Sequence, residues 1–239
     1  MITSKNNEKL KLVRKLGQKK HRERLGLFVT EGEDLARAGL AAGHDPYALL
    51  VHPDCGIEGE TVEPDLLAGV SSLSSGSRAI GIWPEIWTDP EEVASDGKFL
   101  FLDAVTDPGN VGTIIRTADA LVGGTTVLGP GAADPYSPIA VRASMGSVFT
   151  QPLLKSPVAV TPAPRIALVL GDGEKPGPME GPATICLGSE REGLSPGVLK
   201  ECEVRWTIPQ RSGGAQSLNV AAAAAIACER ISSPAGQGL

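Results

Sequence analysis

An asparagine and an arginine stand where a buried strand gives way to a predicted helix. Residues 107–119 read DPGNVGTIIRTAD, so Asn110 and Arg116 lie six positions apart. Both are expected near the first turns of that helix, whose positive end favours phosphate. An arginine keeps its charge at any usable pH and grips phosphate with a two-pronged fork. The structural alternative makes Asn110 a helix cap and Arg116 a surface charge.

Two further stretches place polar residues beside glycines. Residues 187–195 read LGSEREGLS, where Gly188 is expected to let an adenosine-sized ligand approach the backbone and Glu190 to orient the asparagine and arginine. Residues 208–209 are Ile-Pro, and residues 217–219 are Ser-Leu-Asn. The structural alternatives are an ordinary strand-to-helix turn for the first stretch and a helix cap for Ser217.

In this order and spacing, the three stretches resemble the signature motifs of the SpoU/TrmH family, the knotted 2′-O-ribose RNA methyltransferases. The resemblance implies S-adenosylmethionine as methyl donor and no metal. It implies these catalytic residues: Arg116, Asn110, Glu190, Ser217 and Asn219. It implies these cofactor-binding residues: Gly171, Gly188, Ile208, Pro209, Ser217 and Leu218. In relatives the arginine matching Arg116 is essential and is proposed to position the target phosphate and ribose, or to assist removal of the 2′-proton.

The resemblance continues through residues 134–149, where Arg142 matches a family arginine expected to face RNA. Two positions depart from the family pattern. Ile139 stands where many relatives have lysine, which removes one possible phosphate contact. The loop from residue 208 to residue 217 is one residue longer than usual, with Gln210 in place of methionine.

Positive charge is concentrated at the amino terminus of an otherwise acidic chain. The formal net charge is −6, but residues 1–30 contain nine Lys and Arg against two Glu. Such a block binds polyanions by releasing counterions, although a solvated helix face is the simpler alternative. The residues expected to contact RNA are Arg14, Lys15, Lys19, Lys20, Arg22 and Arg24, together with Arg142.

The first half of the chain predicts a small α/β domain over residues 1–83. A helix capped by Ser4 is expected to run to about Arg24, followed by strands at 27–30, 47–51 and 78–83 and helices at 31–42 and 64–69. Residues 2–6 and 22–32 resemble the substrate-binding domain joined to many of these enzymes, whose fold is like that of ribosomal protein L30e. Residues 84–96, rich in proline and acidic side chains, are the expected linker.

The second half, residues 97–239, predicts a parallel α/β sheet. Apolar runs at 99–102, 125–128, 166–170, 184–187 and 204–208 are the expected strands. Helices are expected from Asn110 to 121 and over 137–145, 195–202 and 217–230. Alternation of this kind gives a parallel sheet. The resemblance adds a trefoil knot, the SPOUT fold, and a homodimer formed by this half.

The sequence contains few features of a site that uses a histidine base, a metal ion or a phosphate-binding loop. All three histidines lie in the first half, which disfavours a histidine base in the motif half. There is no metal-ligand spacing and no GxxxxGK[ST] phosphate loop. The four cysteines are scattered, which favours free thiols in a reducing cytoplasm, and the longest apolar run is too short for a bilayer.

The predicted function is S-adenosylmethionine-dependent 2′-O-ribose methylation of structured RNA, with 23S rRNA favoured over tRNA. One alternative is a non-catalytic RNA-binding or ribosome-assembly protein on the same fold. Another is a Rossmann-type nucleotide-binding protein that uses Gly129 and Gly131, although the third glycine of that fingerprint is missing. The sequence does not identify the RNA or the modified nucleotide, nor whether the modification confers antibiotic resistance.

Overall fold

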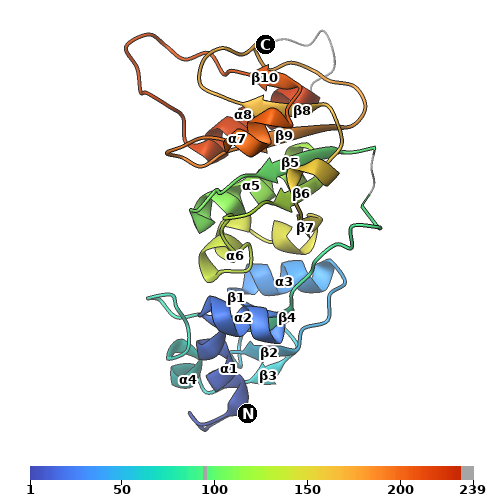
Figure 1. Ribbon diagram of the computed structural model, residues 1–239. Coiled ribbons are helices and arrows are strands. Elements are labelled where there is room, and N and C mark those ends of the chain that lie inside the picture. The colour runs from blue at the N-terminus through green and yellow to red at the C-terminus, as the bar shows by residue number, and fades with distance from the viewer. Residues whose placement is uncertain (94–95, 233–239) are drawn as a thin grey trace. The chain divides into compact units, whose positions relative to one another are not determined.

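The computed structural model describes residues 1–93 and 96–232, which form two compact units (Figure 1). The first unit comprises Met1–Ile86 together with Asp134–Thr150, and the second comprises the rest. Each unit has an α/β fold, as the sequence predicts. The sequence-based division assigns residues 134–150 to the second half of the chain, whereas the structure groups them with the first unit.

The first unit is built on a four-stranded sheet of order β1-β4-β2-β3. Its strands are β1 (Leu27–Glu31), β2 (Ala48–Val51), β3 (Glu60–Thr61) and β4 (Ala79–Pro84). Strand β4 runs antiparallel to β1 and β2, and β3 is parallel to β2. Its helices are α1 (Glu8–Leu16), α2 (Lys19–Leu25), α3 (Glu33–Ala41), α4 (Pro64–Ala68), α6 (Pro138–Ser144) and the 3-10 turn η1 (Ser147–Phe149).

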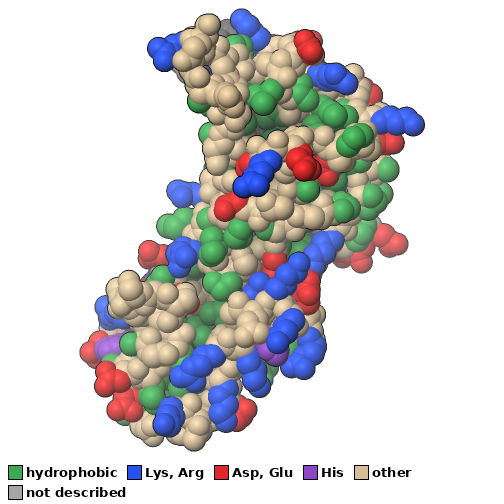
Figure 2. All heavy atoms as spheres, turned by 60° about the vertical axis from the view of Figure 1, so that its left-hand side comes forward, with side chains coloured by type: hydrophobic (Ala, Val, Ile, Leu, Met, Phe, Trp, Pro, Cys, Tyr) green, Lys and Arg blue, Asp and Glu red, His purple; other side chains and the backbone are tan. Residues whose placement is uncertain are grey.

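The single helix expected up to Arg24 is in fact two helices. Helix α1 is capped by Asn7, whose side chain accepts a hydrogen bond from the Lys9 amide, so Ser4 is not the cap. Helix α2 ends at Gly26, whose φ of 61° lies in the left-handed region that favours glycine. Lys and Arg side chains crowd over the first unit, in the lower part of the view in Figure 2.

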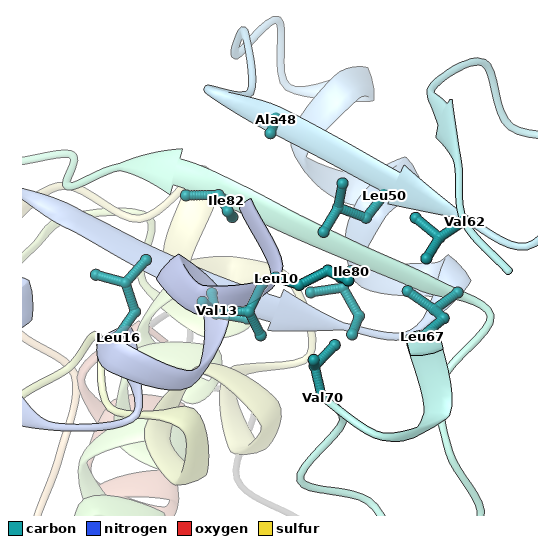
Figure 3. Packing of buried hydrophobic residues seen from close by; sticks show 11 residues of the cluster. Leu10, Val13, Leu16, Ala48, Leu50, Val62, Leu67, Val70, Ile80 and Ile82 are labelled. Carbon is teal, nitrogen blue, oxygen red and sulfur yellow. The ribbon is translucent and has the colours of Figure 1, made fainter. Parts of the chain in front are cut away.

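Alternating residues of this sheet pack against different helices. One cluster includes the apolar stripe of α1, which consists of Leu10, Val13 and Leu16 (Figure 3). The sheet contributes Val29, Leu50, Ile80 and Ile82 to this cluster. The intervening positions Leu49, Val51 and Ala79 pack with Ala36 of α3. The period of two along each strand therefore gives the sheet two buried faces.

A buried ion pair holds α2 to the segment before α6. Nε and Nη2 of Arg22 donate to Oδ2 of Asp134 at 2.9 and 2.7 Å, and Nη1 donates to the Leu16 carbonyl at 2.8 Å. Arg22 is only 3% exposed. Its guanidinium is fully engaged inside the first unit.

The second unit contains a parallel six-stranded sheet of order β10-β8-β9-β5-β6-β7. Its strands are β5 (Lys98–Leu102), β6 (Thr125–Leu128), β7 (Leu153–Lys155), β8 (Arg165–Leu168), β9 (Ala183–Leu187) and β10 (Val204–Trp206). Its helices are α5 (Pro108–Leu121), α7 (Pro196–Lys200), α8 (Val220–Ser232) and the 3-10 turn η2 (Val158–Val160). The parallel sheet predicted from the apolar runs is confirmed.

Strand β5 lies in the interior of this sheet, as its uninterrupted apolar run predicts. One face packs Phe99, Phe101 and Cys186 against Val198 of α7 and Val158 of η2. Helices α5 and α8 pack against each other and contact β6 and β9. None of the helices over residues 1–93 and 96–232 is long and apolar enough to cross a membrane.

Irregular segments lie along both edges of the six-stranded sheet. At the β7 edge, the Thr88 amide donates to the Leu153 carbonyl at 2.9 Å, and Lys155 Nζ lies 4.0 Å from the ring centroid of Trp87. At the β10 edge, Glu174 pairs with the strand through the Arg205 carbonyl at 3.0 Å and the Thr207 amide at 2.8 Å. Both edge strands thus have a hydrogen-bonded neighbour along their outer side.

Candidate active site

Helix α5 begins one turn earlier than an Asn110 cap requires. Asp107 is the cap, because its Oδ1 accepts the Asn110 amide at 2.8 Å and Pro108 follows as the first helical residue. Asn110 therefore lies within the first turn, and its side chain is free for other partners. The expectation that Asn110 caps the helix is wrong.

Instead, the Asn110 side chain joins all three motifs. Its Nδ2 donates to Oε1 of Glu190 at 2.6 Å, and its Oδ1 accepts a hydrogen bond from Nδ2 of Asn219 at 3.0 Å. We call this line of side chains the Glu190–Asn110–Asn219 network. The donors and acceptors fix the orientation of the Asn110 amide, since a carboxylate can only accept.

The loop that carries Glu190 is held tightly on both sides. The Ser189 and Gly193 backbones exchange two hydrogen bonds, each of 3.0 Å. A Cβ at Gly188 would lie 2.1–2.4 Å from backbone atoms of Gly193 and Leu194. Glycine is thus required at position 188 because the chain folds back on itself there, and not only to admit a ligand as the sequence suggested.

Asp103 anchors the end of the same loop, and the three sequence motifs did not point to it. This residue directly follows β5, is 6% exposed, and accepts the Ser195 amide through Oδ2 at 2.6 Å. A polar residue at the carboxyl end of an interior parallel strand is the signal that could have identified it.

Arg116 lies further along α5 than expected. Six residues correspond to about 9 Å of helix axis, so it stands on about the third turn, beyond the reach of the helix dipole. The expectation that Arg116 lies at the positive end of the helix is therefore wrong. Its side chain is exposed and makes no hydrogen bond or ion pair with any described residue.

Helix α8 begins at Val220, three residues after Ser217. Asn219 caps it, with Oδ1 accepting the Ala221 amide at 2.9 Å and the Ala222 amide at 3.3 Å. The same side chain donates to Asn110 through Nδ2, so it has two roles. Residues 209–219 are all exposed.

A cavity of about 340 Å³ lies beside the network, within the second unit. Its apolar lining includes Leu168, Val169, Leu170, Leu187, Leu194, Leu199, Ile208, Leu218 and Val220. Its polar lining comes from residues 189–192 together with Gln210 and Ser217. Mostly apolar pockets of this volume with a few polar groups are typical of small-molecule sites.

The cavity includes four of the six residues expected to bind the cofactor: Gly188, Ile208, Ser217 and Leu218. Gly171 and Pro209 are not part of the lining, although Gly171 follows Leu170 and its carbonyl accepts a hydrogen bond from Thr207 Oγ1 at 3.0 Å. Glu190 lines the cavity and belongs to the network, so it connects the two. Gln210, the residue that departs from the family pattern, also faces this space.

No group of three His, Cys, Asp or Glu side chains over residues 1–93 and 96–232 could hold a metal ion. The glycines of the Rossmann-type alternative have packing roles. A Cβ at Gly129 would lie 2.4 Å from the Phe101 ring, and one at Gly131 would lie 3.2 Å from Ala104. Both positions serve the chain's own packing.

The residues expected to bind RNA fall into two groups. Arg14, Lys15, Lys20 and Arg24 are exposed on α1 and α2 and form no ion pair with a described residue, and Arg142 is exposed on α6. Lys19 pairs with Glu23 at 3.7 Å. Arg22 is the exception, because its charge is buried against Asp134 and is not available to RNA.

The exposed cations lie close enough together to act on a neighbouring histidine. Desolvation, followed by the charges of Lys20, Arg24 and Lys15, lowers the pKa of His21. We call the exposed set Arg14, Lys15, Lys20 and Arg24 the basic surface.

Comparison with known proteins decides the family. A model of the SpoU rRNA Methylase family matches residues 97–229, and the chain is 32% identical over 244 residues to 23S rRNA (guanosine(2553)-2′-O)-methyltransferase RlmP of Bacillus subtilis, covering 94% of this chain and 96% of that protein. The chain belongs to the SpoU rRNA methylase family. The family predicted from the three motifs is confirmed.

Other matches agree with this SpoU family member. A model of an MRM3-like substrate binding domain matches residues 7–76. A 23S rRNA (uridine(2479)-2′-O)-methyltransferase of Streptomyces viridochromogenes is 32% identical over 187 residues, or 70% of this chain and 65% of that protein. The crystal structure of an AdoMet-bound rRNA methyltransferase from Sinorhizobium meliloti has a TM-score of 0.82 and 27% identity, with 95% of each chain covered.

Proposed function

We propose that this protein transfers the methyl group of S-adenosylmethionine to a ribose 2′-hydroxyl of 23S rRNA. The Glu190–Asn110–Asn219 network at the cavity wall carries the proposal, because it joins the three motifs that mark the family. The relatives from Bacillus subtilis and Streptomyces viridochromogenes are both named 23S rRNA 2′-O-methyltransferases. The first of them is matched along almost its whole length.

The cavity suits S-adenosylmethionine in size and character. Apolar side chains such as Leu187 and Ile208 offer a surface for the adenine. Among the charged lining residues, Glu190 and Glu192 outnumber Arg191, which leaves a net negative charge that complements a sulfonium. The bound cofactor supplies a methyl group that the sulfonium already activates. Positioning the hydroxyl in line with that group can then contribute up to about 7–11 kcal/mol.

The proposed catalytic residues consist of three side chains that hydrogen-bond one another and two further side chains. Asn110, Glu190 and Asn219 are fixed by one another, which suits groups that orient the reacting ribose. Ser217, a residue of the third motif, lines the cavity from an exposed loop. Arg116 is exposed and has no hydrogen-bond or ion-pair partner among the residues that the structure describes, so we assign it to binding the target phosphate and ribose.

We infer that the enzyme is a homodimer through α5 and α8. Leu121 of α5 and Ile226 of α8 are 43% and 38% exposed, and Leu218 beside the cavity is also 38% exposed. Alanines along α8 would permit close helix packing. A second subunit on this face would cover the apolar side chains and bring an additional Arg116 to the site. The trefoil knot of the SPOUT fold stays a prediction.

The basic surface of the first unit is our proposed contact with RNA, together with Arg142. Exposed cations without acidic partners bind phosphate at the lowest cost, because no ion pair has to be broken. The match of residues 7–76 to a substrate binding domain supports this role. All four cysteines are free thiols, which supports the expected cytoplasmic location.

The decisive experiment is methylation of ribosomal RNA from cells that lack the gene. Purified protein and radiolabelled S-adenosylmethionine are incubated with 23S rRNA, 16S rRNA and tRNA, and resistance of the labelled linkage to alkali shows 2′-O-methylation. Label in 23S rRNA at one nucleotide is the expected result. Label only in tRNA would move the substrate to the tRNA class, and RNA binding without label would favour a non-catalytic protein.

Analytical ultracentrifugation tests the dimer separately. Sedimentation of a monomer at micromolar concentration would contradict the dimer.

A further inference from the structure

The loop that carries Glu190 leaves the sheet and returns to it at a single residue, Asp103. The Asp103 amide donates to the Leu187 carbonyl at 2.8 Å, where the loop begins. The Asp103 carboxylate accepts the Ser195 amide through Oδ2 at 2.6 Å, where the loop ends. The backbone and the side chain of one residue therefore hold both ends of the loop over residues 188–194.

The bond between Asp103 and Ser195 is of a strong kind. Its acceptor is a carboxylate that is only 6% exposed, so little water competes for the N–H group. Further along the loop, the two hydrogen bonds between Ser189 and Gly193 join its two arms. The anchored ends and the joined arms together determine where the tip of the loop, with Glu190, is held.

The chain bends directly after Asp103. Ala104 has a φ of 51°, in the left-handed region that residues other than glycine seldom adopt. Such backbone persists only where the surrounding structure holds it, and it is concentrated at functional sites. The bend leads from β5 to Asp107, the cap of α5, and so to Asn110. The side chain of Asp103 thus holds the loop of Glu190, and its backbone leads to the helix of Asn110.

We propose that Asp103 is a positioning residue for methyl transfer, which fixes Glu190 against Asn110 and beside the cavity. This inference rests on the proposed function. Loss of the carboxylate releases the end of the loop at Ser195, so that Glu190 is no longer held at one distance from Asn110. A misplacement of about 1 Å near a reacting centre can cost on the order of 10²-fold in rate.

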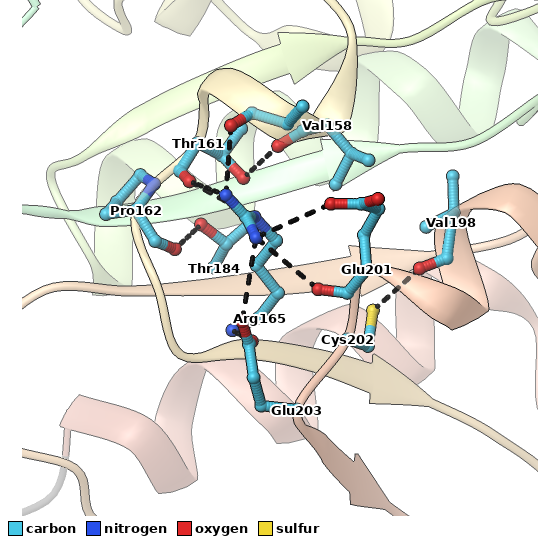
Figure 4. A network of polar contacts seen from close by, with 10 residues as sticks. Val158, Thr161, Pro162, Arg165, Thr184, Val198, Glu201, Cys202 and Glu203 are labelled. Carbon is cyan, nitrogen blue, oxygen red and sulfur yellow. Dashed lines mark hydrogen bonds and ion pairs between the residues drawn. The ribbon is translucent and has the colours of Figure 1, made fainter.

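The other end of helix α7, which follows the loop, offers a matched comparison. The Arg165 guanidinium donates to the Glu201 carbonyl at 3.5 Å and pairs with the Glu203 carboxylate at 3.6 Å (Figure 4). Arg165 therefore holds the carboxyl end of α7, as Asp103 holds the loop before its amino end. Arg165 belongs neither to the Glu190–Asn110–Asn219 network nor to the lining of the cavity.

The first test compares turnover at saturating S-adenosylmethionine and RNA. Asp103→Ala should lower turnover by on the order of 10²-fold, while the affinity for RNA is unchanged. Asp103→Asn should recover about 10-fold of that loss, because its Oδ1 still accepts the Ser195 amide. Arg165→Gln should lower the midpoint of thermal unfolding, yet turnover measured well below that midpoint should stay near that of the wild type. Equal turnover of Asp103→Ala and Arg165→Gln, or no recovery in Asp103→Asn, would overturn the positioning role.

The donor of the hydrogen bond provides a second test that keeps the carboxylate and applies even if Asp103→Ala does not fold. The φ of Ser195 is −63°, the angle that proline adopts, so Ser195→Pro removes the N–H group with little change at φ. Ser195→Ala is the matched variant, because both changes remove the hydroxyl that caps α7 at Val198. Turnover should be on the order of 10-fold lower in Ser195→Pro than in Ser195→Ala. Equal turnover of the two would also overturn the positioning role.

Calorimetric titration with S-adenosylmethionine distinguishes this inference from the proposed function. The wild type should bind, and Asp103→Ala should bind several-fold more weakly, because residues 188–194 line the cavity. A wild type that binds no S-adenosylmethionine would overturn the proposed function. A wild type that binds it and methylates RNA no faster than Asp103→Ala would overturn only the role of Asp103.

Discussion

Asn110 and Glu190, eighty residues apart in the chain, share a hydrogen bond of 2.6 Å between Nδ2 and Oε1. Asp107 makes this bond possible, because it caps α5 and releases the Asn110 side chain from that task. The bond joins the first turn of α5, the helix that follows β5, to the loop after β9, and β5 and β9 are neighbouring strands of the parallel sheet. The network thus depends on the capping of α5 by Asp107 as well as on its own three side chains.

We expect Asn110→Asp to reduce turnover by on the order of 10²-fold, because its new carboxylate would face Glu190 and could not donate to it. Methyl transfer at saturating cofactor measures this effect, and cofactor affinity should change little. Asp107→Asn is the matched control, since asparagine also caps a helix well. Equal losses in both variants would mean that the helix start, and not the network, is responsible.

Arg116→Ala should abolish methyl transfer while cofactor affinity stays nearly intact. Arg116→Lys should also fail, because a point charge does not reproduce a two-pronged contact. The loss should appear mainly in turnover and should reach about 10²-fold or more. Near-normal turnover of Arg116→Ala on its RNA would remove this residue from the catalytic set.

Gly188→Ala should destabilise the protein, by about 1–3 kcal/mol or more, because the added Cβ meets backbone atoms that cannot rotate away. Gly197→Ala is the control, since a Cβ there meets no atom within 4 Å and the residue lies in α7. That change should be neutral or stabilise the fold by about 0.4–1 kcal/mol. Urea unfolding monitored by circular dichroism compares them, and similar stabilities would contradict the tight fold of the loop.

Replacing Lys15, Lys20 and Arg24 with alanine should weaken RNA binding and flatten its dependence on salt. Removing each cation that neutralises a phosphate should lower the slope of log affinity against log salt by about 0.7–0.9. Lys9→Ala is the control, because Lys9 already pairs with Glu60. An unchanged slope in the triple variant would place the RNA-binding surface elsewhere. Deletion of residues 1–24 is unsuitable here, since Leu10, Val13 and Leu16 belong to the core.

Arg22→Ala should destabilise the first unit by about 3–5 kcal/mol, the cost typical of breaking a buried ion pair from one side. Asp134 would be left without its partner in a poorly solvated place. Thermal unfolding measures the loss, and exposed Arg24→Ala should stay within about 0.5 kcal/mol of the wild type. A small effect of Arg22→Ala would show that water reaches Asp134.

The sequence predicted the fold well where a local pattern decides the structure. The uninterrupted apolar run at β5 predicted an interior parallel strand, and the stripe of Leu10, Val13 and Leu16 predicted a helix packed on a core. The prediction of where a helix starts failed when two nearby residues could each cap the same helix. Asn110 and Asp107 can both cap α5, and Ser4 and Asn7 can both cap α1, so the choice depends on which neighbouring turn forms.

Long-range pairing limited the prediction of the site. Nothing in the local sequence shows that Arg22 meets Asp134, 112 residues later, so one cation of the amino-terminal block was wrongly assigned to RNA.

Two features of the fold were also missed. Strand β7 is only three residues long and carries little pattern of its own. Residues 134–150 likewise read as a continuation of the second half, because the sequence does not show that they pack with the first unit.

The segments along the two sheet edges also protect the enzyme from aggregation. A bare edge strand offers free N–H and C=O groups to any other chain, and the short strands β7 and β10 would both do so without Thr88 and Glu174. A truncated chain that begins at residue 97 keeps all three sequence motifs but leaves the β7 edge uncovered. Both this chain and one that begins at residue 85 lose the first-unit partners of residues 134–150, so only the β7 edge distinguishes them. We expect the chain that begins at residue 97 to self-associate at a lower concentration than the chain that begins at residue 85, which keeps Thr88.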